Sequence, residues 1–141
     1  MAEIRPYRET DFAAVLALWQ ACGLTRPWNP PEADIALVRA SGHGALLVAE
    51  AEGRICGTVM VGHDGHRGWV YYLAVDPAWQ RRGLGTRLLR AAEAWVAARG
   101  VRKLELMIRD GNAAAADFYA RCGYGREPVI VMSRWLDKAE A

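Results

Sequence analysis

Polar and apolar residues alternate at the start of the chain, and helical spacing follows at once. Residues 3–8 alternate, which predicts an edge strand, because Pro6 is tolerated only where no backbone N–H is needed. The next apolar residues recur every three or four positions, which predicts a helix that ends at Gly23. A proline-rich turn over residues 26–31 then leads into a shorter helix near residues 31–40.

The middle of the chain has the composition of β-strands. Apolar runs at residues 45–51 and 54–62 are separated by a two-residue Glu-Gly turn, which predicts a hairpin. The polar loop 63–68 connects this hairpin to a third run at residues 69–75, rich in aromatic and β-branched residues. We therefore expect three consecutive strands here.

The apolar spacing changes from strand-like to helix-like in the second half. It predicts a helix over residues 83–99, a strand over 101–109, a helix over 112–121 and a final strand over 127–135. The predicted order is β-α-α-β-β-β-α-β-α-β. Such alternation favours one α/β domain over residues 1–141, with a mixed sheet and helices on both faces.

Composition excludes several classes of protein. With 52% apolar and 24% charged residues, the chain has enough apolar surface for one core and is not intrinsically disordered. A net charge of +2 does not indicate a nucleic-acid binder, for which a concentrated basic face is expected. No apolar run is long enough to span a membrane and no signal core opens the chain, so we expect a cytoplasmic protein without membrane partners. The three widely spaced cysteines indicate neither a disulfide framework nor a metal site.

The strongest chemical signal is a pair of glycines where a strand joins a helix, at residues 75–86. Gly83 and Gly85 let the backbone approach a ligand closely, and a helix N-terminus attracts anions such as phosphate. Arg81 and Arg82 add positive charge at the same place. The alternative interpretation is a tight turn whose glycines serve only packing.

Two well-known phosphate loops do not fit this segment. A P-loop requires a lysine after Gly85, and the dinucleotide fingerprint requires a glycine where Leu88 stands. What remains is Q-x-x-G-x-G after a strand that reads L-x-V-x-P, and it resembles motif A of the GNAT N-acetyltransferases. In that family the loop holds the pyrophosphate of acetyl-CoA. The resemblance assigns acetyl-CoA binding to the loop residues Gln80, Arg81, Arg82, Gly83, Leu84, Gly85 and Thr86.

A second segment extends the resemblance. Asn112, Ala115 and Tyr119 match the family's N-x-x-A-x-x-x-Y pattern, and their spacing places them on one helix face. Asn112 caps the helix and offers an amide to the pantetheine arm. The small side chain of Ala115 lets a ligand lie against the same face. Tyr119, with an ordinary pKa near 10, is suited to protonate the departing thiolate. The alternative is that Tyr119 is a core aromatic.

The family fold separates two neighbouring parallel strands and places the pantetheine between them. Here those strands are 69–75 and 101–109, and the resemblance implies that the backbone of Leu73, Ala74 and Val75 holds the pantetheine and polarises the thioester carbonyl. Over its whole length the chain looks most like the YpeA-type members.

The acceptor side is less well marked. Candidate acceptor-binding residues come from the Pro-rich turn, the loop 63–68 and the tyrosine pair: Trp28, Asn29, Asp64, His66 and Tyr71. Two histidines on a turn without further ligands do not indicate zinc, so we expect no metal. Tyr71 and Tyr72 are expected on opposite faces of their strand, one in the core and the other beside the acceptor.

The general base is not identified by the sequence. The RimI-type enzymes, which acetylate protein N-termini, resemble this chain around L-x-x-R-x-x-N-A-A-A but carry a glutamate where Met107 stands. Glu105, two residues earlier on the same strand face, or a chain of waters would have to replace that glutamate.

The leading hypothesis is an acetyl-CoA-dependent N-acetyltransferase that transfers the acetyl group by direct attack in a ternary complex. The acceptor is a primary amine, on a small molecule or a peptide, and the protein is a monomer or a homodimer. The alternatives are a non-catalytic acyl-CoA sensor and a RimI-like N-terminal acetyltransferase.

Overall fold

A mixed five-stranded sheet organises the first of two compact units in the chain. The computed structural model describes residues 1–137, and the units are Met1–Met107 and Ile108–Ala141. The first unit holds every strand and three of the four α-helices that the structure describes. The α/β class with a mixed sheet is therefore confirmed.

The strands follow one another across the sheet in chain order. They are β1 (Glu3–Pro6), β2 (Gly44–Ala51), β3 (Arg54–His63), β4 (Gly68–Val75) and β5 (Leu104–Leu106). The first four are antiparallel neighbours, whereas β5 runs parallel to β4. The predicted hairpin turn is present, with φ of 54° at Glu52 and 75° at Gly53, the left-handed pair that a tight two-residue turn requires.

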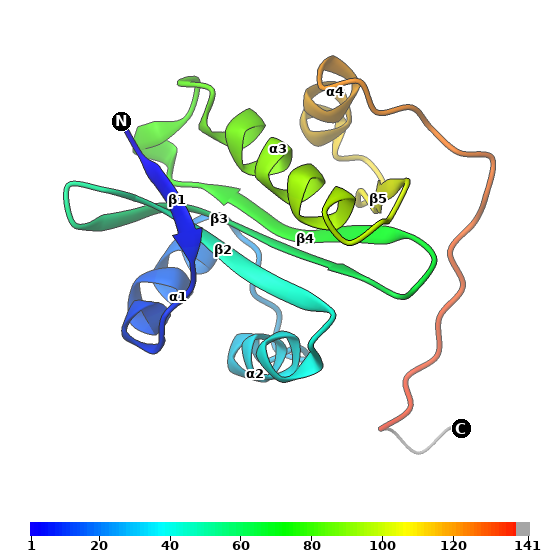
Figure 1. Cartoon of the computed structure of the whole chain (residues 1–141), viewed down its shortest axis with the longest axis horizontal. Coiled ribbons are helices and arrows are strands. Elements are labelled where there is room, and N and C mark those ends of the chain that lie inside the picture. The colour runs from blue at the N-terminus through cyan, green and yellow to red at the C-terminus, as the bar shows by residue number, and fades with distance from the viewer. Residues whose placement is uncertain (138–141) are drawn as a thin grey trace. The chain divides into compact units, whose positions relative to one another are not determined.

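Helices cover both faces of this sheet (Figure 1). The short 3-10 helix η1 (Glu9–Asp11), α1 (Phe12–Ala21) and α2 (Pro31–Ser41) lie on one face, and α3 (Leu84–Ala97) lies on the other. Two neighbouring β3 residues show how successive residues face opposite sides of the sheet. Thr58 bonds to Trp19 of α1, whereas Gly57 faces α3 so closely that a Cβ there would lie 2.8 Å from Leu88.

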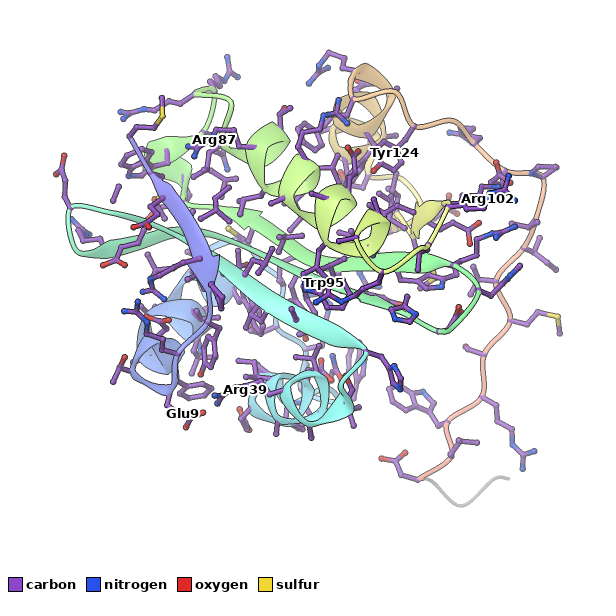
Figure 2. All side chains as sticks on the ribbon, viewed as in Figure 1. Glu9, Arg39, Arg87, Trp95, Arg102 and Tyr124 are labelled. Atoms are coloured by element: carbon purple, nitrogen blue, oxygen red, sulfur yellow. The ribbon has the colours of Figure 1, made fainter. Side chains whose placement is uncertain are left out.

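The core on the α1–α2 face brings distant segments together around Trp19, whose side chain is fully buried. Val15 and Leu18 of α1, Ile35 of α2 and Met60 of β3 belong to the same cluster. At its edge, Arg39 of α2 lies 5.2 Å over the Tyr7 ring. The same guanidinium pairs with Glu9 of η1, as their facing side chains in Figure 2 show.

Strand β4 contains a bulge at Tyr72. Thr58 pairs with Ala74 and Met60 with Tyr71, so the single residue Val59 opposes both Tyr72 and Leu73. Tyr72 has φ of 53°, a left-handed conformation that costs a bulky residue about 1–2 kcal/mol. The surrounding contacts offset this cost and fix the bulge.

Two contacts hold the bulge from the α1 side. The Tyr72 ring stacks on Trp19, with centroids 3.8 Å apart and planes 11° from parallel. The Thr58 hydroxyl accepts from Trp19 Nε1 at 2.9 Å and donates to the Tyr72 carbonyl at 2.8 Å. One buried hydroxyl therefore connects α1, β3 and β4.

The expectation that Tyr71 and Tyr72 face opposite sides of the strand is wrong. Residues directly opposite in an antiparallel pair share a face, so Tyr71 lies on the side of Met60, which is the α1–α2 face. Tyr72 is on that face too, because it stacks on Trp19. The extra residue of the bulge shifts the alternation by one position.

The predicted separation of β4 from its parallel neighbour is present. Only Gly68, Trp69 and Val70 pair with β5, and β4 then continues to Val75. Along Tyr71–Val75, no strand of the described chain occupies this edge. The strand expected over 101–109 is thus much shorter, and the gap leaves an open backbone edge.

The second unit contains α4 (Ala113–Arg121). The strand expected over residues 127–135 is wrong, since the structure assigns no strand there. Ile130 is 84% and Met132 85% exposed. The apolar pattern gives this segment strand propensity, but a strand forms only when a neighbouring strand accepts its backbone hydrogen bonds.

We expect Thr58→Val to destabilise the protein by about 2 kcal/mol or more, because it leaves the buried Trp19 N–H and Tyr72 carbonyl without their partner. The free energy of unfolding in urea measures this loss. Ser41→Ala is the control, since the exposed Ser41 hydroxyl bonds only to local backbone, and its effect is expected within about 0.5 kcal/mol. Equal effects of the two substitutions would contradict the role of Thr58.

Candidate active site

Two hydrogen bonds of Asp76, one to β3 and one within the loop, define the start of the loop after β4. The Asp76 backbone N–H donates to the Cys56 carbonyl at 2.9 Å, and its carboxylate accepts from the Ala78 N–H at 2.8 Å. This second bond caps the short 3-10 helix η2 (Pro77–Trp79). The chain therefore leaves the sheet in a defined direction before α3 begins.

The start of α3 has the form of an anion site. Arg81 and Gly83 are both left-handed, with φ of 65° and 79°. Gly83 is the N-cap residue, and its carbonyl accepts the helical bond from Arg87 at 3.1 Å. Because glycine has no capping side chain and the first turn has no acidic residue, the first-turn N–H groups and the helix dipole favour an anion there.

Positive charge surrounds this helix start. Arg81 and Arg82 are exposed, and the Arg82 guanidinium lies 4.8 Å over the Trp79 ring. Arg87 lies further along α3 and donates to the Ala2 carbonyl at 2.8 Å (Figure 2). The loop arginines are thus available to a ligand, whereas Arg87 ties α3 to the N-terminal strand region.

The open edge of β4 leads directly into this loop. The Val75 carbonyl accepts from the Gln80 amide at 3.4 Å and from the Cys22 thiol at 3.5 Å. Burial raises the pKa of Cys22, so this thiol stays protonated and acts as a donor. Of the residues assigned to acetyl-CoA, Leu73–Val75 and Gln80–Thr86 lie along one continuous stretch from strand edge to helix N-terminus.

A hydrogen-bonded group on the α2 side joins three segments. Tyr72 Oη donates to Asp34 Oδ2 at 2.6 Å, and Asn29 Nδ2 donates to the same oxygen at 2.9 Å. Asn29 Nδ2 also lies 3.2 Å from Tyr72 Oη. Burial, and next the hydrogen bond to Asp34, raise the pKa of Tyr72, so the phenol stays protonated. Asn29 was expected at the acceptor side, and Tyr72 was one of the two tyrosines considered for it, whereas Asp34 was not expected there.

The other acceptor candidates are not all brought together. Trp28 is 53% and Tyr71 46% exposed. Burial, and next the charge of Asp64, raise the pKa of Tyr71. Asp64 caps its own turn by accepting from the N–H groups of His66 and Arg67, at 2.9 and 2.8 Å, which lower its pKa. Within residues 1–137, no group of three His, Cys, Asp or Glu is placed to hold a metal.

In the second unit, Asn112 caps α4 as expected. Its Oδ1 accepts from the Ala115 N–H at 3.1 Å, and Asn112 itself is exposed. Tyr119 lies among aromatic rings, with Phe118 5.0 Å and Tyr124 6.0 Å away between centroids. Burial raises the pKa of Tyr119 to about 12, so the phenol stays protonated at neutral pH.

No residue of the described chain is identified as the general base. Met107, where the RimI-type enzymes carry glutamate, is 47% exposed. Glu105 lies in β5 opposite Trp69 and is half-buried. Its part in proton transfer stays a prediction.

Residues 12–124 match the model of the acetyltransferase (GNAT) family. The chain belongs to this family. It is 42% identical over 134 residues to Acetyltransferase ECA0875 of Pectobacterium atrosepticum, an alignment that covers 95% of both proteins. The YpeA-type subgroup stays a prediction.

Solved structures with the same fold include an aminoglycoside N-acetyltransferase, AAC(6')-Iy, in complex with CoA. It has a TM-score of 0.81 at 18% identity, over 96% of this chain and 95% of that one. An aminoglycoside acetyltransferase from a soil metagenome, in complex with sisomicin, has a TM-score of 0.79 at 21% identity, over 97% of both chains. No helix in residues 1–137 is long and apolar enough to cross a membrane.

The left-handed N-cap gives a prediction for Gly83→Ala. A Cβ there would meet nothing within 4 Å, so the cost is backbone strain alone, about 1 kcal/mol of unfolding free energy. Chemical denaturation measures it. Gly125→Ala, at a glycine without positive φ and with open space around its Cβ, is expected to cost no more than about 0.5 kcal/mol. An unchanged stability of Gly83→Ala would argue against the left-handed cap.

Proposed function

We propose that this protein is an acetyl-CoA-dependent N-acetyltransferase that acts on a primary amine by direct attack in a ternary complex. The observation that carries the proposal is the side-chain-free, left-handed cap at Gly83, beside Arg81 and Arg82 and after the open edge of β4. This sequence of features fits a ligand with an extended arm and a pyrophosphate. Family membership and a fold shared with a CoA-bound acetyltransferase support it.

In this proposal, Gln80–Thr86 bind the pyrophosphate through backbone N–H groups, the helix dipole and two guanidinium groups. Backbone groups of Leu73, Ala74 and Val75 hold the pantetheine arm and polarise the thioester carbonyl, where negative charge develops. Asn112 offers its amide to the same arm, and Ala115 presents a small side chain to it. All of these residues belong to one GNAT domain spanning residues 1–141.

The reaction forms one bond and breaks one. A neutral amine nitrogen attacks the thioester carbon, the tetrahedral intermediate collapses, and the carbon–sulfur bond breaks. Tyr119 donates its proton to the departing thiolate and is then reprotonated from solvent. A base or a water chain removes the proton from the amine, and Glu105 is a candidate for it.

The acceptor is a small-molecule amine. Some of the solved structures of the same fold carry the names of aminoglycoside acetyltransferases, and one carries the name of a glucosamine-6-phosphate N-acetyltransferase from Arabidopsis thaliana, which supports this class. The absence of a glutamate at Met107 argues against the RimI-like alternative. A cytoplasmic location, no metal, no nucleic-acid or membrane partner, and a monomer or homodimer stay predictions from the sequence.

Calorimetric titration with acetyl-CoA tests the cofactor assignment. We expect saturable binding by the wild type and at least about tenfold weaker binding by Gly83→Trp, because the indole would cover the start of α3. Gly42→Trp is the matched control, since Gly42 has a similar φ of 72°, equally open space and a position at the end of α2. A folded wild type that does not bind acetyl-CoA would refute the proposal and the acyl-CoA sensor alternative together.

Tyr119→Phe tests the proton donor. We expect kcat to fall about 100-fold or more, with little change in acetyl-CoA affinity. A phenol with a pKa of about 12 stays protonated through ordinary assay conditions. Wild-type kcat should therefore show no loss from this group between about pH 8 and about pH 10, where an unshifted tyrosine would begin to ionise. Tyr7→Phe is the control, and equal kcat values for Tyr119→Phe and wild type would exclude Tyr119 from the mechanism.

A further inference from the structure

The group formed by Asn29, Asp34 and Tyr72 leaves one carboxylate oxygen of Asp34 free to accept a further hydrogen bond. Both donors, the Tyr72 phenol at 2.6 Å and the Asn29 amide at 2.9 Å, bond to the Oδ2 oxygen of Asp34. Within residues 1–137, Oδ1 of the same carboxylate has no hydrogen-bond partner, and no Lys or Arg lies within ion-pair distance of it. Asp34 lies half-buried in the first turn of α2, and its carboxylate is held by two hydrogen bonds but has no ion-pair partner among the described residues.

The three residues come from different parts of the fold and are held by its core. Tyr72 is held by the stacking of its ring on the fully buried Trp19 ring and by the hydrogen bond from the Thr58 hydroxyl to its carbonyl. Its left-handed φ of 53° directs the phenol to α2 instead of along the strand. The same bulge, which lies within the open edge of β4, therefore sets the position of the Asp34 carboxylate.

Two exposed aromatic residues are the chain neighbours of the donors that hold this carboxylate, an arrangement that suits an organic cation. The bulge places Tyr71 on the same face of the sheet as Tyr72, with 46% of its side chain exposed. Trp28, next to Asn29 in the chain, is 53% exposed. Exposed aromatic rings attract cations through their faces, and an oriented carboxylate oxygen accepts strongly from an ammonium group.

We propose that Asp34 binds an ammonium group of the acceptor, and that the acceptor therefore carries at least two amines. This inference rests on the proposed function. The amine that attacks the thioester must be uncharged, because a protonated nitrogen has no electron pair to donate. The cation that Asp34 holds is consequently a second, non-reacting ammonium, and Tyr72 and Asn29 are positioning residues for the carboxylate. Tyr72 directly precedes Leu73, the first residue assigned to the pantetheine, so this cation would be held near the reacting end of the acceptor.

A matched pair of substrates tests the proposal. 1,5-Diaminopentane and 5-amino-1-pentanol have the same length and the same reacting amine, but only the first carries a second ammonium. For the wild type with saturating acetyl-CoA, we expect kcat/KM to be at least about tenfold higher for the diamine, since a charged hydrogen bond at a half-buried site discriminates by that factor. The difference should appear mainly in KM.

Asp34→Asn is the decisive variant, because an asparagine keeps the shape and an oxygen that accepts from Tyr72 and Asn29. We expect it to lower kcat/KM for the diamine about tenfold, to the level of the amino alcohol, and to leave the amino alcohol within about twofold. Glu32→Gln is the matched control. It removes an exposed carboxylate from the same helix two residues earlier and should leave the ratio of the two substrates unchanged.

Tyr72→Phe supplies a second, independent variant. It keeps the ring that stacks on Trp19 but removes the hydroxyl that orients Asp34, so the preference for the diamine should fall without disappearing. If Asp34 had a merely structural role, Asp34→Asn would instead lower kcat/KM for both substrates by the same factor.

Three results would overturn the inference: equal kcat/KM for the two substrates in the wild type, equal losses on both substrates in Asp34→Asn, or no turnover of the diamine by a protein that binds acetyl-CoA. A protein that does not bind acetyl-CoA would instead contradict the proposed function, so the two failures are distinguishable.

Discussion

The backbone conformation of Tyr72 is the constraint on which the rest of the described site depends. A bulky residue with positive φ is strained, and the strain persists only because stacking on Trp19 and two hydrogen bonds at the Thr58 hydroxyl hold it. The bulge turns two successive tyrosines to one face and brings a phenol to Asp34. Just before this bulge, the pairing of β4 with β5 ends at Val70. One irregularity is thus associated with the open backbone edge and with the Asp34 carboxylate.

A second departure from regular backbone, at Arg81 and Gly83, forms the part of the proposed cofactor site at the start of α3. Arg81 and Gly83 are left-handed, and they turn the chain from η2 into α3 so that the helix begins with uncapped N–H groups. The positive side chains lie on the same few residues, and the Trp79 ring supports one of them. Each irregular segment is followed closely in the chain by a core residue. Ala74 is buried in β4, and Leu84 is buried at the start of α3. Such placement joins a rigid scaffold to backbone groups that a ligand can reach.

The two incorrect expectations have a common physical origin. The apolar and β-branched residues in 127–135 were sufficient for strand propensity, but pairing requires a neighbour, and propensity contains no information about one. The same period-two rule placed Tyr71 and Tyr72 on opposite faces, and it failed because one extra residue in β4 shifts every side chain by one position. Both errors come from treating a strand as an isolated segment. The prediction of the helix in the second unit did not meet this difficulty. Its cap joins Asn112 and Ala115, which are only three positions apart in the chain.

The sequence alone therefore determined the local features: the hairpin at Glu52, the glycine cap at Gly83, the Asn112 cap and the motif spacing that identifies the family. Each depends on contacts between residues close in the chain, which local propensity and glycine or asparagine chemistry specify. Tertiary structure decided the bulge at Tyr72 and the carboxylate at Asp34. The Asp34 contact joins residues 38 positions apart, and the Trp19–Thr58 bond joins residues 39 positions apart. No periodic pattern encodes such pairs, because they form only when a packed core brings a helix, a loop and a strand to the same place.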